Sequence, residues 1–155
     1  MKKKVLIVSF ILLLIDLVSK TIIFSSNKLL KGTVIIKNFL RIRPIRNYGA
    51  AFSSFENMNV LLISISVIVL IYLLVTMNKQ KEKFLNYFSY GLLIGGLLGN
   101  LVDRIIYGYV RDFISFRFFN YDFAIFNFAD CGIVLGVILL IIISFIKEKK
   151  YGNSK

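Results

Sequence analysis

The sequence predicts an all-α polytopic membrane protein, with four transmembrane helices and a small extramembrane β-structure on the outer face. Of its 155 residues, 57% are hydrophobic, and they form long uninterrupted runs rather than the periodic amphipathic segments of a soluble domain. Crossing a bilayer takes about 20 apolar residues. Four segments qualify, namely 5–24, 60–77, 84–106 and 126–146. Residues 1–155 are therefore expected to form a single membrane-embedded domain.

The first predicted span begins like a secretory signal peptide, because lysines at 2–4 precede an apolar core. The apolar run continues through Asp16 and Lys20 to Phe24, and no cleavage site with small residues follows. We therefore expect this segment to stay in the protein as its first span.

Lysines mark one side of the predicted membrane protein. They cluster at 2–4, 79–83 and 147–150, and the positive-inside rule makes that side cytoplasmic. Both termini are then inside, and the loop over 25–57 is outside, although this loop also carries basic residues. Polar residues from three spans would share one depth near the outer face, namely Asp16, Lys20, Asn100, Asp103, Arg104, Asn127 and Asp130.

The outer loop is predicted to hold two short strands on the membrane surface. Residues 33–36 all have β-branched side chains, and residues 39–43 alternate apolar with basic side chains. Pro44 is expected to end the second strand or to place it at an edge. Residues 47–52 predict a turn that leads into a short surface helix or loop.

Composition argues against several other classes of site. The chain has one cysteine, Cys131, and no histidine, so it has no internal disulfide and no histidine metal site, and a zinc site is not expected. We expect no cofactor. The net charge of +12 would suit a nucleic-acid binder, but the apolar composition favours lysines that contact anionic lipid head groups instead.

Charged side chains inside a bilayer cost about 2.5–3.5 kcal/mol each on insertion scales, so those predicted within the spans need a reason. Asp16 and Lys20 are four residues apart, on one helix face, and can pair. The pair either lowers the cost of insertion or shapes an active site. Asn100 and Arg104 also share a face, while Asp103 and Arg104 neutralise either each other or charges on neighbouring spans.

Two acids flank the return of the chain to the membrane. Asp112 follows the third span, and Asp130 stands near the start of the fourth, so the loop between them can bring their side chains together. Two close carboxylates share one proton and can activate a water while polarising a carbonyl, with Asn127 orienting Asp130. The alternative is a helix cap at Asp130 and a solvated loop acid at Asp112. Spacing does not choose between Asp112 and Asp103 as the partner of Asp130.

Five ordered motifs closely resemble those of bacterial lipoprotein signal peptidases, also called signal peptidase II. The resemblance covers residues 16–136, and the size and four-span plan agree with it. The motifs are DLVSK (16–20), NYGAAF (47–52), GGLLGNLVDR (95–104), VRDFI (110–114) and FNFAD (126–130).

The resemblance implies an aspartic endopeptidase of the bacterial cytoplasmic membrane, with its site near the outer face and an extramembrane β-cradle matching the predicted strands. Such enzymes cut prolipoprotein signal peptides just before a cysteine that carries diacylglycerol. It also implies membrane lipids as surroundings, globomycin-type inhibitors and a monomeric state, without nucleic acid. Asp112 and Asp130 would be the catalytic pair. The residues that bind substrate or support the site would be Asn47, Gly49, Asn100, Arg104, Asn127, Asp16, Lys20, Asp103 and Ala129.

Three departures from the family pattern are small. Ser19 stands where threonine is common, Ala124 where proline often precedes the last motif, and Cys131 where serine is frequent. None removes a proposed catalytic atom. Two other classes remain as alternatives: a small ion- or proton-relay transporter that uses the intramembrane carboxylates, and a purely structural four-span protein.

Overall fold

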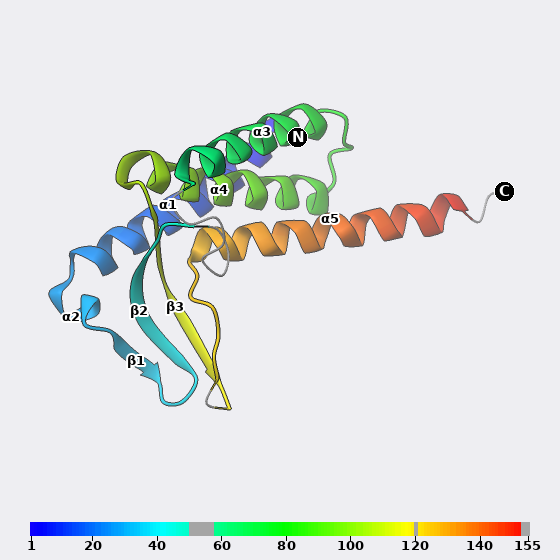
Figure 1. Cartoon of the computed structure of the whole chain (residues 1–155). Coiled ribbons are helices and arrows are strands. Elements are labelled where there is room, and N and C mark those ends of the chain that lie inside the picture. Colours follow the sequence, from blue (N-terminus) through cyan, green and yellow to red (C-terminus); the bar gives the residue numbers. More distant parts are fainter. Residues whose placement is uncertain (50–57, 120, 153–155) are drawn as a thin grey trace.

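The computed structural model describes residues 1–49, 58–119 and 121–152. Its long helices run side by side, and the strands lie together beyond one end of them (Figure 1). The helices are α1 (Lys2–Ser25), α2 (Asn27–Leu30), α3 (Asn59–Met77), α4 (Phe84–Tyr107) and α5 (Phe128–Gly152). The strands are β1 (Thr33–Ile36), β2 (Leu40–Asn47), β3 (Val110–Phe118) and β4 (Tyr121–Asp122).

Among the described residues, four helices are long and apolar enough to cross a membrane: α1, α3, α4 and α5. Helix α4 lies at the centre, because it packs against the other three and is the most buried of the four. The other three expose many leucine, isoleucine and valine side chains, as a surface that meets lipid does. These helices and the small sheet confirm the predicted fold class.

Glycines let α4 approach its neighbours closely. A Cβ atom added at Gly91 would lie 2.5 Å from Val8 Cβ, and one at Gly95 would lie 2.7 Å from the carbonyl oxygen of Ser9, both on α1. A Cβ at Gly96 would collide with the backbone of Ala129 on α5. Small residues at these positions therefore bring three helix backbones into contact, as in many membrane bundles.

The strands form an antiparallel sheet in the order β1-β2-β3-β4. The two predicted strands are present, but the expectation that Pro44 ends or edges the second is wrong. Strand β2 continues to Asn47 and lies between β1 and β3. Its register with β3 shifts between Ile42 and Ile45, and this break in the regular pairing accommodates Pro44, which has no N–H to donate.

Strand β3 was not predicted from the sequence, because the segment after α4 was expected to be a loop. Gly108 ends α4 with a φ of 78°, a conformation that glycine adopts without strain, and the chain enters β3 two residues later. Pairing of Ile45 with Asp112 and of Asn47 with Val110 fixes β3 beside β2. The sheet is held against the end of α1 by a buried apolar cluster around Ile23, Phe113 and Ile114.

Both ends of the described chain lie at the end of the helices opposite the sheet (Figure 1). The amino group of Met1 is 2.7 Å from Glu82 Oε2 in the connection between α3 and α4. Lys147 Nζ, near the end of α5, donates to Gln80 Oε1 in the same connection at 2.9 Å. The three lysine clusters at 2–4, 79–83 and 147–150 therefore meet at one end of the molecule.

Candidate active site

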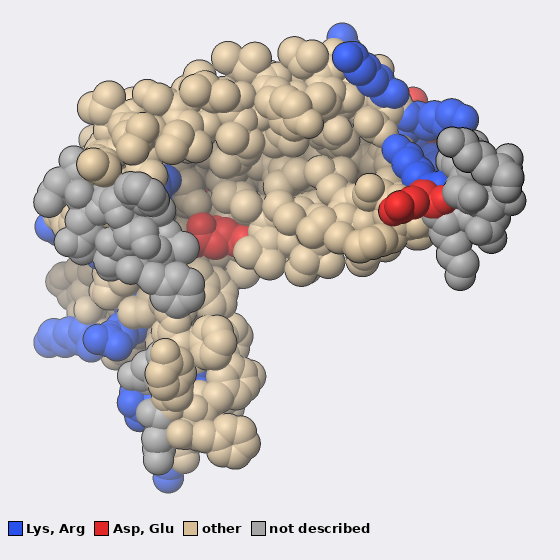
Figure 2. Space-filling view, turned by 45° about the vertical axis from the view of Figure 1, so that its right-hand side comes forward, with Lys and Arg blue, Asp and Glu red and all other residues tan. Residues whose placement is uncertain are grey.

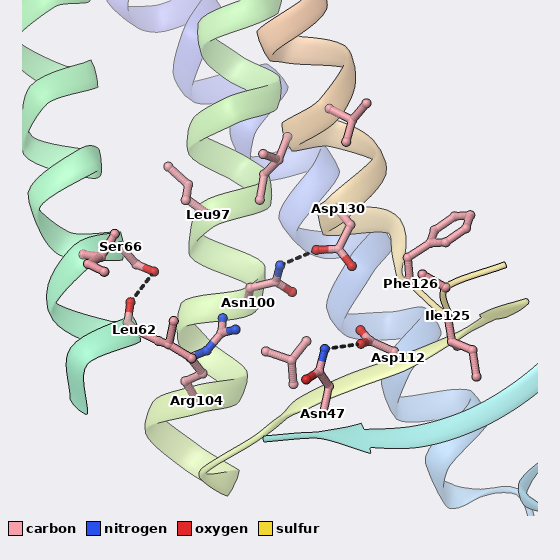
Figure 3. A pocket seen from close by; sticks show the side chains of 15 residues that line it. Asn47, Leu62, Ser66, Leu97, Asn100, Arg104, Asp112, Ile125, Phe126 and Asp130 are labelled. Atoms are coloured by element: carbon pink, nitrogen blue, oxygen red, sulfur yellow. Dashed lines mark hydrogen bonds between the residues drawn. The ribbon is translucent and has the colours of Figure 1, made fainter. Parts of the chain in front are cut away.

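Asp112 and Asp130 line one pocket, to which they come from different elements (Figure 3). Asp112 is on β3 and is 1% exposed, while Asp130 is in the first turn of α5. Asn127 joins them: its Nδ2 donates to Asp112 Oδ1 at 2.6 Å, and its backbone N–H donates to Asp130 Oδ2 at 3.1 Å. The solvated loop acid considered for Asp112 is therefore ruled out.

The start of α5 fixes the direction of Asp130. Asn127 stands directly before the helix, and its Oδ1 accepts from the backbone N–H of Asp130 at 2.9 Å, while Asp130 accepts from Asn127 in return. This reciprocal pattern is a capping box, so Asp130 caps the start of α5 through Oδ2, as the helix-cap alternative expects. The other carboxylate oxygen, Oδ1, accepts from Asn100 Nδ2 at 2.7 Å and faces the pocket (Figure 3).

The surroundings of Asp112 favour its protonated form. Burial, and next the negative charge of Asp130, raise the pKa of Asp112 to about 7, although hydrogen bonds from Asn47 and Asn127 oppose the shift. The Asn47 bond joins Nδ2 to Asp112 Oδ2 at 2.9 Å. A carboxyl group that keeps its proton near neutral pH can serve as a general acid.

A buried ion cluster lies behind the carboxylate pair. Lys20 Nζ is 2.6 Å from Asp16 Oδ2 and 3.2 Å from Asp103 Oδ2, and all three side chains are fully buried. The predicted pairing of Asp16 with Lys20 is confirmed. Lys20 also donates to Asn100 Oδ1 at 3.2 Å, and Asp16 Oδ1 accepts from the backbone N–H of Ala129 at 2.9 Å. The cluster thus reaches the pocket through Asn100 and the start of α5.

Arg111 is a member of this cluster that sequence reasoning missed. Its Nε and Nη2 donate to Asp103 Oδ1 at 3.0 and 2.7 Å, and its backbone N–H donates to Asp103 Oδ2 at 2.9 Å. Its guanidinium also lies 4.6 Å from the ring centre of Tyr107. Asp103 is therefore paired with β3 and α1, and it does not line the pocket. Its position eight residues before Arg111 gave no periodic signal, because a helix end and a turn separate them.

Arg104 lines the pocket (Figure 3). Its Nη2 donates to the carbonyl oxygen of Gly49 at 3.0 Å, and the Gly49 N–H donates to Asn47 Oδ1 at 3.0 Å. These bonds confirm a turn after Asn47 as far as Gly49. The surface helix or loop expected to follow lies outside the described residues. Among the described residues the ion pairs of Asp103 are with Lys20 on α1 and Arg111 on β3, which favours the reading that it neutralises charge on a neighbouring span.

The pocket has a volume of about 400 Å³ and two kinds of wall. Its polar end holds the two carboxyl groups, and Figure 2 shows acidic atoms exposed in a hollow where the helices meet the sheet. Apolar side chains line the pocket from α3, α4 and α5, namely Leu62, Ile65, Leu97, Ile133 and Val134. Val110, Ala124, Ile125 and Phe126, outside these helices, also line it. Within the described ranges, no group of three or more His, Cys, Asp or Glu side chains could hold a metal ion.

Fold and site together define a polytopic membrane protein with a pair of carboxyl groups in a pocket at one end of its spans. The family model described as "Signal peptidase (SPase) II" matches residues 8–146. The chain belongs to this family of membrane peptidases.

Relatives in several bacteria support the assignment over nearly the whole chain. The lipoprotein signal peptidase of Halothermothrix orenii is 37% identical over 145 residues, which cover 94% of this chain and 97% of that protein. The lipoprotein signal peptidase of Staphylococcus haemolyticus is 38% identical, covering 100% and 99%.

A solved structure of a bacterial membrane enzyme superposes with a TM-score of 0.85 at 35% identity, and the match covers 97% of this chain and 91% of that one. A second structure described in the same words gives a TM-score of 0.78 at 36% identity, with 89% and 90% covered. None of these comparisons favours the transporter alternative.

Proposed function

We propose that this chain is an aspartic endopeptidase that removes signal peptides from diacylglyceryl-modified prolipoproteins, cutting just before the lipidated cysteine. The observation that carries the proposal is the bridging of Asp112 and Asp130 by Asn127 at the polar end of a pocket with an apolar side. The relatives named as lipoprotein signal peptidases supply the substrate class.

In the proposed reaction the two carboxyl groups have opposite roles. Asp112, whose pKa is raised to about 7, donates a proton to the carbonyl oxygen of the scissile peptide. Asp130, whose two oxygens both accept hydrogen bonds, takes a proton from the water that attacks the carbonyl carbon. Collapse of the tetrahedral intermediate breaks the C–N bond, with the proton on Asp130 passing to the leaving nitrogen and the diol proton returning to Asp112.

The polar residues around the pair are proposed to hold the substrate backbone. The side chains of Asn100 and Arg104 both line the pocket, and each has donors that can reach a peptide carbonyl. Asn47 and Asn127 keep Asp112 in place, and Asp16, Lys20, Asp103, Gly49 and Ala129 support the site through the contacts described above.

The substrate is proposed to enter from the lipid. Helix α3 packs on α4, and α5 packs on α4 and α1, while the pocket is lined from α3 by Leu62 and Ile65 and from α5 by Ile133 and Val134. An apolar signal-peptide helix can lie along this wall with its cleavage site at the carboxylate end, while its acyl chains stay among lipids.

The orientation follows from the lysines. Their clusters meet at the end of the molecule opposite the sheet, and the positive-inside rule assigns that end to the cytoplasm. The proposed site then faces the outer side of the cytoplasmic membrane, and both termini are inside.

Cleavage of a purified diacylated prolipoprotein by the purified chain tests the proposal. Asp112→Asn and Asp130→Asn should each remain folded and lose cleavage, whereas Asp122→Asn on β4 is the matched control and should keep it. Full activity of either pocket variant would overturn the aspartic mechanism. Absence of cleavage by the wild-type chain, with an unlipidated precursor cut instead, would overturn the substrate assignment.

A further inference from the structure

A second pocket lies at the end of the molecule opposite the carboxylate pair. It has a volume of about 450 Å³ and lies between the start of α4 and the last turns of α5. We call it the basic pocket, because four lysines line it and no acidic residue does: Lys79, Lys81, Lys83 and Lys147. Figure 2 shows basic side chains gathered around this end of the helices.

The positive charge of the basic pocket is not neutralised from within the described chain. Glu82 stands among the lysines in sequence, but its carboxylate lies 2.7 Å from both Lys4 Nζ and the Met1 amino group. These contacts, the Lys4 hydrogen bond first, lower the pKa of Glu82 to about 2. None of the ion pairs found between described residues includes a lysine of the basic pocket. Glu148 follows Lys147 but does not line the pocket.

The first turn of α4 adds no negative charge. Lys83 precedes this turn without making a side-chain cap, and the turn contains no acidic residue. The positive end of the helix dipole therefore adds to the charge of the lysines.

Below the lysines the basic pocket has an apolar wall. Phe84 on α4 is 59% exposed and Ile146 on α5 is 57% exposed, and Leu85 and Ile143 line the same pocket. The bond from Lys147 to Gln80 joins α5 to the connection at the rim. The lysines stand at the ends of spanning helices, next to an exposed apolar wall. A bilayer has the same order, with charged head groups next to acyl chains, so the basic pocket is expected to lie at the boundary between them.

We propose that the basic pocket binds one anionic glycerophospholipid. Its phosphate would lie among the lysines, and an acyl chain would lie along Phe84 and Ile146. A neutral zwitterionic lipid of the same chain length would add a positive group to an already positive site, so charge complementarity favours the anionic lipid. The proposal does not depend on the peptidase activity, since the basic pocket shares no residue with the carboxylate site.

Native mass spectrometry of the full chain in detergent micelles tests this proposal. The chain is titrated with dioleoyl phosphatidylglycerol and, separately, with dioleoyl phosphatidylcholine. We expect one phosphatidylglycerol to be retained about tenfold or more tightly than phosphatidylcholine, as two to four nearby lysines predict. The double variant Lys83→Gln/Lys147→Gln should lose this preference. Lys2→Gln/Lys3→Gln removes the same charge from the same end outside the pocket and should keep it.

Three results would overturn the proposal. The first is equal retention of the two lipids by the wild-type chain. The second is an equal loss of preference in the control double variant, which would indicate unspecific attraction to the whole basic end. The third is displacement of phosphatidylglycerol by inorganic phosphate at matched concentration, which would indicate a free-anion site. Circular dichroism and the unfolding temperature check that both double variants are folded.

Discussion

Asn127 Nδ2 lies 2.6 Å from Asp112 Oδ1, so the residue that caps the start of α5 also holds a carboxyl group of β3. The same amide nitrogen lies 3.1 Å from Asn100 Oδ1 on α4. One side chain thereby ties the sheet to two spanning helices. Backbone hydrogen bonds between Ile114 and Phe126 also join β3 to the residues before α5, so the amide and the backbone together set the relative position of Asp112 and Asp130.

Replacing Asn127 should therefore lower the cleavage activity while changing the stability of the fold only slightly. Serine can still cap α5, but it is too short to reach Asp112. We expect Asn127→Ser to unfold within a few degrees of the wild-type chain while its kcat falls about 10²-fold, the lower part of the range for general acid–base catalysis. Steady-state cleavage of a diacylated prolipoprotein and thermal unfolding in detergent measure the two effects. An unchanged kcat would show that the bridge does not position the pair.

The rate of cleavage should fall as the pH rises through about 7. Asp112 must hold a proton to donate it, and its pKa of about 7 places the loss of that proton in this range. The dependence of kcat/KM on pH reports groups of the free enzyme, so initial rates from pH 5 to pH 9 measure it. Asp122→Asn should show the same alkaline decline as the wild-type chain. A rate that stays constant to pH 9 would contradict the role of Asp112 as the acid.

The helices were predictable because twenty-residue apolar runs have few alternatives, whereas strand β3 was not. Its residues 110–118 are mostly buried for different reasons: Arg111 by its ion pair, Asp112 by the asparagines, and Phe113 by the sheet core. No alternation of polar and apolar residues remains to mark a strand with two buried faces. The high cost of burying charge identified the polar layer, but spacing did not separate Asp103 from Asp112. The family resemblance pointed to Asp112, and the structure gives the contacts: Asp103 pairs with Lys20 and Arg111, and Asp112 lines the pocket.

Protonation of Asp112 should also make stability depend on pH. The ordinary pKa of this carboxyl is 3.8, against about 7 in the folded chain. Between these values the folded state binds more protons than the unfolded state, so stability falls as the pH rises from about 4 to about 7. A shift of this size corresponds to at most about 4 kcal/mol. Unfolding temperatures at pH 5 and pH 8 should differ less for Asp112→Asn than for the wild-type chain, and parallel values would contradict the shift.

Lys20 should be the most sensitive member of the buried ion cluster, because it lies between two carboxylates, Asp16 and Asp103. Lys20→Met leaves one more buried negative charge than positive charge there, since Arg111 still pairs with Asp103. Removing one partner of a buried pair destabilises a protein by about 3–5 kcal/mol. The double variant Asp16→Asn/Lys20→Met also removes the unpaired charge and should recover part of the loss. Denaturation in detergent measures all three chains, with Lys28→Met at the exposed helix α2 as the control. If Lys20→Met and Lys28→Met are equally stable, the cluster does not hold the site together.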